Sequence, residues 1–235
     1  MKNKNDFIPY NRQSIDEDDI NAVTRVLRSN LITTGLEAEN FENNISKYCD
    51  VTYSLVCSNA TSALQIVLEA LNIGKNDCVI SSPISFIAGA NATRQVGADV
   101  LFCDVNPETG NIDLDCLEII LKNNSNVKVV MPVHLAGIPV DMERLYFLSQ
   151  TYNFKIVEDA CHALGGGYWD DKESYNKIGN CKHSDLTVFS FHPIKNITTG
   201  EGGAITTNSK DLYNKLKIIR NHGVVRDKES FINKE

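Results

Sequence analysis

Short apolar runs alternate with stretches of helical character along this chain, and that alternation restricts its fold more than any other feature. The apolar runs predict strands at 53–57, 77–80, 99–103, 127–132, 154–158, 186–190 and 203–207. Strands that are apolar throughout are typical of a sheet covered on both faces, and helical connections between them favour parallel pairing. We therefore predict an α/β fold in which helices sandwich a mainly parallel sheet.

The segments between these strands have the length and composition of helices. From Ala60 onward the sequence predicts a long apolar helix that ends near Gly74. The other connecting helices are expected at 84–95, 113–122, 141–151 and 209–221. Asp113 and Asp141 are the predicted N-caps of two of these helices. A short acidic side chain at that position can accept the unpaired N–H groups of the first helical turn.

Two more helices are expected before the first strand. Ser14-x-x-Glu17 and Thr34-x-x-Glu37 both have the spacing of a capping box, and each is followed by apolar residues at helical intervals. The polar and glycine-rich stretch 165–182 interrupts the alternation. It predicts a surface loop or a hairpin.

Charge and cysteine content exclude several classes of protein. A formal net charge of −7 argues against a nucleic-acid partner, which needs a basic face to displace counterions. The seven cysteines contain no C-x-x-C pair, so we predict reduced thiols, neither a disulfide framework nor a metal site. The start of the sequence has no apolar signal region, and no run approaches the ~18 apolar residues of a membrane span. We predict a cytoplasmic protein with no membrane partner.

Candidate site residues follow the predicted strands, where ligands of open parallel sheets bind. In SNATSAL (58–64) small residues join a strand to a helix, so the N–H groups of Ala60 and Thr61 are free for an anion such as a phosphate. The simpler interpretation is an ordinary N-cap formed by Ser58 or Asn59. The sequence of this segment alone favours the simpler interpretation.

Two further segments carry charged residues at strand ends. VEDACHALG (157–165) places Asp159 at the end of a strand and His162 shortly after it. The Asp159 carboxylate could bind a protonated ring nitrogen. The simpler interpretation is a helix-capping aspartate followed by a packed histidine. In SFHPIKNITTGEGGAIT (190–206) Lys195 lies in a loop of small residues after Ser190. Its amine can attack a carbonyl carbon, although a surface lysine there needs no explanation. A phosphate cradle, a carboxylate and an amine together are the parts that hold pyridoxal phosphate.

The chain resembles the DegT/DnrJ/EryC1/StrS family of sugar aminotransferases, a group of fold-type I pyridoxal-phosphate enzymes. The resemblance rests on SNATSAL, PISFIAGAN (83–91), GNID (110–113), EDACHALG and FSFHPIKNITTGEGGAITTN (189–208). It implies a homodimer with active sites at the subunit interface. It also implies an N-terminal segment over residues 1–34, the large cofactor domain over 35–235, and a small C-terminal domain that this sequence does not include.

The resemblance also assigns roles to individual residues. Lys195 matches the lysine that forms a Schiff base with the cofactor, and Asp159 matches the acid paired with its ring nitrogen. Ala60, Thr61 and Ser190 match phosphate-side positions, and Phe86 and His162 match positions beside the ring. Residues near the start match sugar-side and cofactor-side positions: Tyr10, Asn30, Leu31, Ile32 and Thr33. RNHG (220–223) resembles a segment near the subunit contact. In relatives an asparagine from the neighbouring chain reaches the phosphate, and Asn221 is the candidate for that role here.

The likeness is greatest to family members that act in pseudaminic acid synthesis. It implies transfer of an amino group from L-glutamate to C4 of UDP-4-keto-6-deoxy-N-acetyl-β-L-altrosamine. Three alternatives stay open: another nucleotide-linked keto sugar, a sugar dehydratase, and a pyridoxal-phosphate-binding module without activity. The dehydratases of this family are expected to have histidine in place of the Schiff-base lysine, so Lys195 argues against that chemistry.

Overall fold

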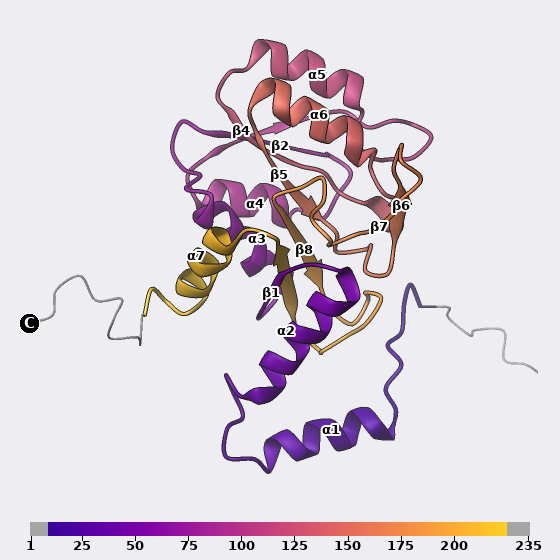
Figure 1. Ribbon diagram of the computed structural model, residues 1–235, viewed down its shortest axis with the longest axis vertical. Helices are drawn as coiled ribbons and strands as arrows, with labels where there is room; N and C mark the ends of the chain where they lie inside the picture. Colours follow the sequence, from indigo (N-terminus) through magenta and orange to yellow (C-terminus); the bar gives the residue numbers. More distant parts are fainter. Residues whose placement is uncertain (1–8, 225–235) are drawn as a thin grey trace, which may run out of the picture.

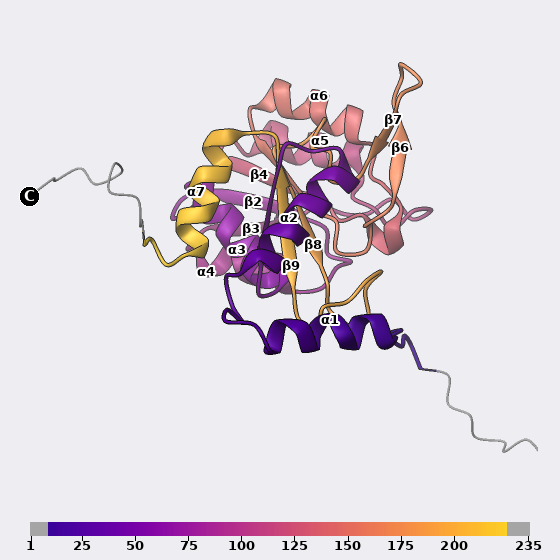
Figure 2. The same cartoon turned by 60° about the horizontal axis from the view of Figure 1, so that its bottom comes forward.

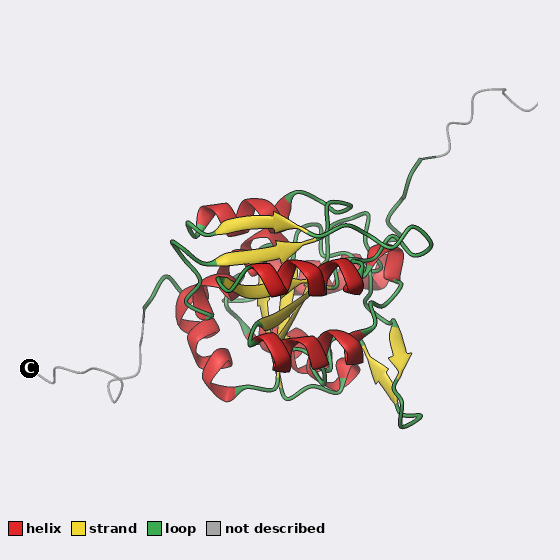
Figure 3. Ribbon diagram, turned by 90° about the horizontal axis from the view of Figure 1, so that it is seen from above, coloured by secondary structure: helices red, strands yellow, loops and turns green. Residues whose placement is uncertain are grey.

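A seven-stranded sheet forms the centre of the computed structural model, which describes residues 9–224, and helices lie on both of its sides (Figures 1 and 3). Across the sheet the strands are β1 (Tyr53–Cys57), β9 (Gly203–Thr207), β8 (Leu186–Ser190), β5 (Lys155–Asp159), β4 (Val127–Met131), β2 (Cys78–Ser81) and β3 (Asp99–Phe102). β9 is antiparallel to β1 and β8, and the other neighbouring pairs are parallel. The predicted α/β fold with a mainly parallel sheet is confirmed.

Six helices cover the two faces of this sheet. One face packs against α3 (Ala60–Ala70), α4 (Ala88–Gln95) and α7 (Lys210–Arg220). The other face packs against α2 (Leu36–Cys49), α5 (Leu114–Asn123) and α6 (Met142–Tyr152). The predicted hairpin within 165–182 is also present, as β6 (Gly167–Trp169) paired with β7 (Tyr175–Lys177).

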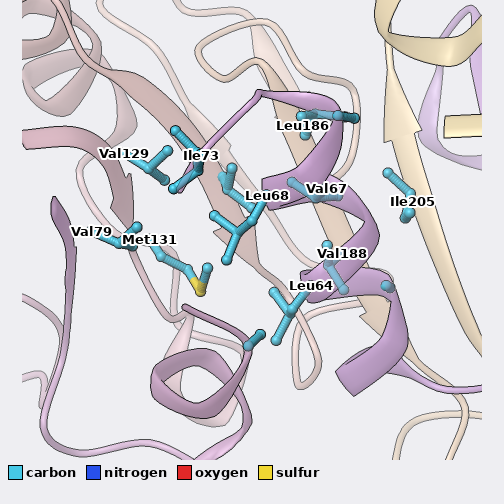
Figure 4. Close-up of a cluster of buried hydrophobic side chains, with 14 of the residues drawn as sticks. Leu64, Val67, Leu68, Ile73, Val79, Val129, Met131, Leu186, Val188 and Ile205 are labelled. Atoms are coloured by element: carbon cyan, nitrogen blue, oxygen red, sulfur yellow. The ribbon is translucent and has the colours of Figure 1, made fainter. Parts of the chain in front are cut away.

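Alternation of side chains along the strands divides the core into two layers. Val79 and Val157 point toward α3, whereas Ile80 and Ile156 point toward α5 and α6. Figure 4 shows the layer around α3, where Leu64, Val67 and Leu68 meet strand residues such as Val129, Met131 and Val188. Burial of each such side chain contributes about 1.5–3 kcal/mol to folding. This layer supports the sheet edge at which the site residues lie.

The predicted N-caps of α5 and α6 are confirmed. The Asp113 carboxylate accepts hydrogen bonds from the N–H groups of Asp115 and Cys116 at 2.9 Å. The Asp141 carboxylate accepts one from the N–H of Arg144 at 3.0 Å. Each contact satisfies a donor that the first helical turn leaves without a partner.

The two predicted capping boxes are wrong. Helix α1 (Glu17–Leu27) begins two residues later than Ser14 implies, because Asp16 is its N-cap. The Asp16 carboxylate accepts the Asp19 N–H, and the Asp19 carboxylate accepts the Asp16 N–H. An acidic pair at the right spacing thus replaces the serine–glutamate pair. Helix α2 begins after Gly35, which offers no capping side chain, and Thr34 has a left-handed backbone with φ of 51°.

Two predicted helix boundaries also need correction. The helix expected from residue 84 begins at Ala88, because Pro83 lies within a turn in which the Ser82 hydroxyl accepts the Ile84 N–H at 3.2 Å. Helix α3 ends at Ala70, short of Gly74, because Asn72 takes the left-handed conformation there. Two backbone bonds of a Schellman motif accompany it, Asn72 N–H to Glu69 O and Ile73 N–H to Leu68 O.

Helix α1 differs from the other helices because it contributes no buried residue. It lies along the outside of the molecule in Figure 2, with Ile20, Val23 and Leu27 between 49% and 66% exposed. Its apolar face is therefore uncovered by the described part of the chain. Within residues 9–224, no helix has the length and apolar character to cross a bilayer.

All seven cysteines lie in the described part of the chain, and none forms a disulfide. Burial is the main cause that raises the pKa of Cys49, Cys103 and Cys181 to about 12. These thiols therefore stay protonated at neutral pH, and the reduced state of all seven cysteines stays a prediction.

Candidate active site

A cavity of about 320 Å³ opens where β1, β5 and β8 end and β9 begins. Its walls come from the start of α3, the loop before α4, the end of β5 and the loop between β8 and β9. Seven residues predicted from the sequence line it together: Ala60, Thr61, Phe86, Asp159, His162, Ser190 and Lys195. Residues separated by up to 135 positions thus meet at one edge of the sheet, as parallel strands require.

The start of α3 supplies an anion-binding wall. Asn59 caps the helix by accepting the Ser62 N–H at 2.8 Å, so Asn59 is the N-cap among the two residues considered from the sequence. The N–H groups of Ala60 and Thr61 precede that bond and have no intrahelical acceptor, and both residues line the cavity. Donors at the positive end of a helix dipole favour a phosphate or a carboxylate.

Gly203 explains how β9 can begin so close to this helix. A Cβ atom at residue 203 would lie 2.6 Å from the carbonyl carbon of Asn59 and 2.7 Å from the N of Ala60. Both are backbone atoms at the start of α3, so they cannot rotate away as a side chain would. Only glycine lets the strand and the helix start approach each other at this distance.

We expect Gly203→Ala to displace the start of α3 and weaken anion binding in the cavity. Overpacking of this kind costs about 1–3 kcal/mol, which corresponds to a loss of roughly tenfold in affinity. Inorganic phosphate and pyridoxal phosphate binding, measured by calorimetry, check the result. Gly74→Ala is the matched control, because its Cβ would meet only Val96 O at 3.7 Å. Equal affinities in the two variants would contradict the role of Gly203.

Asp159 lies at the end of β5 and is 6% exposed. The Cys161 N–H donates to its Oδ1 at 3.2 Å, and no lysine, arginine or histidine within residues 9–224 forms an ion pair with it. Burying a carboxylate without a cationic partner is costly. The geometry therefore indicates that a positively charged group of a ligand completes this site.

Lys195 is half-buried in the loop between β8 and β9. Backbone bonds from Lys195 N–H to His192 O and from Thr199 N–H to Phe191 O, at 2.9 and 3.0 Å, fold the loop over the cavity. The pKa of His162 is lowered, first by burial and then by the positive charge of Lys195. The pKa of Cys161 is raised, first by burial and then by the carboxylate of Asp159. The charges of Lys195 and Asp159 therefore both shift the pKa values of His162 and Cys161 within one cavity.

Phe86 lines the cavity with a ring that is 72% exposed. Ile84 and Ile87 beside it are also exposed, at 47% and 63%. These apolar side chains form an open rim on the loop before α4.

The residues near the start of the chain that were predicted to bind sugar or cofactor do not line this cavity. Tyr10 is 92% exposed, and residues 30–33 are exposed as well. Their roles stay predictions. No pattern in the sequence indicates a neighbouring contact, in which Asn11 Nδ2 donates to the carbonyl oxygen of Ile194 at 2.7 Å. This bond ties the N-terminal segment to the residue before Lys195.

Other lining residues were not predicted from the sequence to bind a ligand: Asn59, Leu64, Ser85, Ala88, Val133, Cys161, His192, Ile194 and Glu201. Most of them stand next to a predicted residue in the same segment. Glu201 and Cys161 belong to the runs TTGEGG and EDACHALG, in which or near which other residues were predicted to bind the cofactor. Their position beside a predicted site residue was the available signal.

The donor set of the cavity fits pyridoxal phosphate. Free helix amides at Ala60 and Thr61 suit its phosphate, and the buried unpaired carboxylate of Asp159 suits a protonated pyridine nitrogen. Lys195 has no hydrogen bond or ion pair of its Nζ atom within residues 9–224, so its amine is available to an aldehyde. A volume of about 320 Å³ is at the lower end of the range of small-ligand sites.

Comparison with known proteins agrees with this fit. The model of the DegT/DnrJ/EryC1/StrS aminotransferase family matches residues 13–235. The UDP-4-amino-4,6-dideoxy-N-acetyl-beta-L-altrosamine transaminase of Campylobacter jejuni subsp. jejuni (strain 81-176) is 39% identical over 221 residues, which are 94% of this chain and 56% of that protein. The chain therefore spans little more than half the length of this curated relative.

Solved structures show the same relation. Helicobacter pylori PseC, an aminotransferase involved in the biosynthesis of pseudoaminic acid, has a TM-score of 0.84 at 33% identity, covering 97% of this chain and 58% of that one. The PLP-form of the putative sugar aminotransferase Spr1654 from Streptococcus pneumoniae has a TM-score of 0.80 at 31% identity, covering 90% and 57%. The predicted fold-type I architecture and the predicted cofactor of the group are confirmed.

Proposed function

The chain belongs to the DegT/DnrJ/EryC1/StrS aminotransferase family, and on that basis we propose that it transfers an amino group to a nucleotide-linked keto sugar with pyridoxal phosphate. The proposed donor is L-glutamate. The proposed acceptor is C4 of UDP-4-keto-6-deoxy-N-acetyl-β-L-altrosamine. The observation that carries the proposal is the buried Asp159 carboxylate, which has no cationic partner in the described chain and shares a cavity with Lys195.

Each part of the cavity has a separate task in this proposal. Pyridoxal phosphate, when bound, supplies an aldehyde that combines with amines and a ring that accepts electrons from the carbon next to the donor nitrogen. The amides at Ala60 and Thr61, with Ser190, bind the phosphate. Asp159 holds a proton on the ring nitrogen. Lys195 would hold the aldehyde, and its Nζ amine would move a proton of the donor.

The names of the relatives support a sugar substrate. The curated relative from Campylobacter jejuni acts on an altrosamine derivative by its name, and a relative from Shewanella sediminis at 35% identity is named for UDP-4-amino-4-deoxy-L-arabinose. Both names describe a UDP-linked sugar with nitrogen at C4. The second name is the reason to retain another nucleotide-linked 4-keto sugar as the alternative acceptor.

We extend the proposal to a homodimer in which the site lies at the subunit interface. Two exposed apolar surfaces support it. One is the face of α1 with Ile20, Val23 and Leu27, and the other is the rim formed by Ile84, Phe86 and Ile87. Burial of such surfaces against a second subunit would remove apolar area from water.

The proposed acceptor is tested by half-reactions with a panel of sugars. The protein is first converted to its amino form with L-glutamate, and recovery of absorbance at about 400–430 nm is followed after each keto sugar is added. We expect the UDP-linked altrosamine ketone to react at least tenfold faster than its C5 epimer or a dTDP-linked 4-keto-6-deoxyglucose. Equal rates would contradict the altrosamine assignment. An adduct that glutamate cannot convert would favour a binding module without activity.

A further inference from the structure

The connection between β4 and α6, residues 133–140, satisfies its backbone in an unusual way. Two of its N–H groups donate to side chains outside it: Leu135 to Asn111 Oδ1 at 3.1 Å and Ala136 to His162 Nδ1 at 3.3 Å. A third, the Val140 N–H, donates to Nδ1 of His134 within the connection at 3.1 Å. Side chains distant in sequence therefore set the shape of this connection. One of them, His162, lines the candidate active site.

Asn111 makes the largest number of these contacts. Besides accepting the Leu135 N–H, it donates from Nδ2 to the carbonyl oxygens of Ile138 and Pro139 at 3.0 and 3.2 Å. The side chain is 5% exposed, and all three contacts reach the same connection. This residue belongs to the GNID run, for which neither the cavity nor the proposed reaction otherwise provides a task.

The backbone that Asn111 clamps is strained. Ala136 has φ of 52° and ψ of 21°, a left-handed conformation that costs an alanine about 1–2 kcal/mol. Gly137 follows with φ of 86°, and a Cβ there would lie 3.1 Å from the His162 carbonyl oxygen. Non-glycine residues keep such conformations only where surrounding contacts hold them. The clamp by Asn111 provides contacts of that kind on both sides of Ala136.

The strain places the Ala136 N–H against the ring of His162. A ring nitrogen that accepts a hydrogen bond carries no proton, so this contact assigns the proton of a neutral His162 to Nε2. Nε2 has no hydrogen-bond partner among the residues that the structure describes. The ring thus presents an N–H donor to the cavity that also contains Lys195 and Asp159.

We propose that Asn111 is a positioning residue of this site: by clamping residues 135–139 it keeps the Ala136 N–H on Nδ1 of His162 and so maintains His162 as an Nε2–H donor toward the bound ligand. The inference deepens the proposed function and rests on it for the identity of the ligand. The tautomer of His162 in the ligand-free protein does not depend on that identity.

The charged and titratable groups around His162 determine the direction of the expected change. They are Asp159, Cys161, His192, Lys195 and Glu201, all lining the same cavity. Burial and the charge of Lys195 lower the pKa of His162, and Asp159 opposes them. The Ala136 N–H also stabilises the unprotonated nitrogen. Loss of this hydrogen bond therefore shifts the pKa of His162 upward, because the bond stabilises the neutral form of the ring and not the protonated form.

The first test measures the tautomer of His162 in the cofactor-free protein by nitrogen-15 NMR of the imidazole rings, assigned with a His162→Gln variant. We expect the Nε2–H form at pH 8. A predominant Nδ1–H form would overturn the proposal without bearing on the proposed reaction. This measurement uses the unaltered chain, so it does not depend on whether any Asn111 variant folds.

The second test compares Asn111→Ala with Asn106→Ala. Asn106 caps the neighbouring turn by accepting the N–H groups of Glu108 and Thr109, and within residues 9–224 its side chain forms no hydrogen bond with residues 133–140. We expect the pKa of His162 to rise by about 0.5 unit or more in the Asn111 variant alone. With cofactor bound, the acid limb of the glutamate half-reaction should move upward equally. An unchanged His162 titration in a folded Asn111 variant would refute the positioning role.

Discussion

Lys195→Ala should lose the absorbance band at about 400–430 nm that forms with pyridoxal phosphate, and its glutamate half-reaction should slow by about 10⁴-fold or more. The reason is that Lys195 is the amine that we propose to hold the aldehyde and to move the proton. Its Nζ atom makes no hydrogen bond or ion pair within residues 9–224, and the side chain is half-buried. Removal should therefore change stability by no more than about 0.5 kcal/mol.

Two companion variants separate the chemistry of this lysine from its charge. Lys195→Arg keeps a positive charge in the loop but offers no amine to the aldehyde, so it should behave as the alanine variant does. Lys75→Ala, at an exposed lysine at the opposite end of the sheet, should leave both the band and the half-reaction intact. Retention of activity in Lys195→Arg, or a global loss of circular dichroism in Lys195→Ala, would contradict the assigned role.

Asp159→Asn should keep the cofactor but slow the glutamate half-reaction by about 10²–10⁴-fold. The Cys161 N–H lies 3.2 Å from Oδ1 of Asp159. An asparagine amide oxygen can still accept this N–H, so the local backbone is preserved. It cannot stabilise a protonated ring nitrogen as a carboxylate does, and the ring then accepts electrons less readily. Stopped-flow absorbance with saturating glutamate measures the effect.

The same substitution should stabilise the cofactor-free protein. A carboxylate that is 6% exposed and lacks a cationic partner in the described chain opposes folding, and a neutral amide of the same shape removes about 1 kcal/mol of that cost. Thermal unfolding without cofactor measures it, and Asp171→Asn, at an exposed acid, is the control. A less stable cofactor-free Asp159→Asn variant, or an unchanged half-reaction, would show that this carboxylate has another function.

The sheet and the clustering of the site were predictable for a simple physical reason. Strands β8 and β9 were placed at their observed bounds, since Leu186–Ser190 and Gly203–Thr207 are short runs flanked by polar or glycine-rich segments. Once the strands are parallel, the residues after them must gather at one edge. Asp159 and Lys195 could therefore be assigned to one cavity from the sequence.

The features that escaped prediction depend on contacts between distant segments. The bond from Asn11 to Ile194 joins residues 183 positions apart. The left-handed backbone of Ala136 contradicts its own local preference and is held by Asn111 from another element. Periodicity and capping rules describe neighbours in sequence, so they carry no information about either. The same limit applies to helix starts such as α1, where Asp16 and Ser14 both had suitable chemistry.

Buried polar pairs behind the cavity were also invisible to the sequence. His134 Nε2 and Glu158 Oε2 lie 2.7 Å apart on the face of β5 opposite Asp159, and Thr187 also donates to Glu158. These contacts lower the pKa of Glu158 against the opposing effect of burial. A lone histidine and a strand glutamate show no common pattern along the chain, because their partnership exists only after β4 and β5 pair.

The proposed function depends above all on a bond between the Nζ atom of Lys195 and the cofactor aldehyde. The most direct measurement is reduction of the pyridoxal-phosphate-treated protein with borohydride, followed by proteolysis and mass spectrometry of every lysine-containing peptide. We expect a single stoichiometric phosphopyridoxyl group on Lys195. Labelling spread over surface lysines, with Lys195 unmodified, would contradict the account.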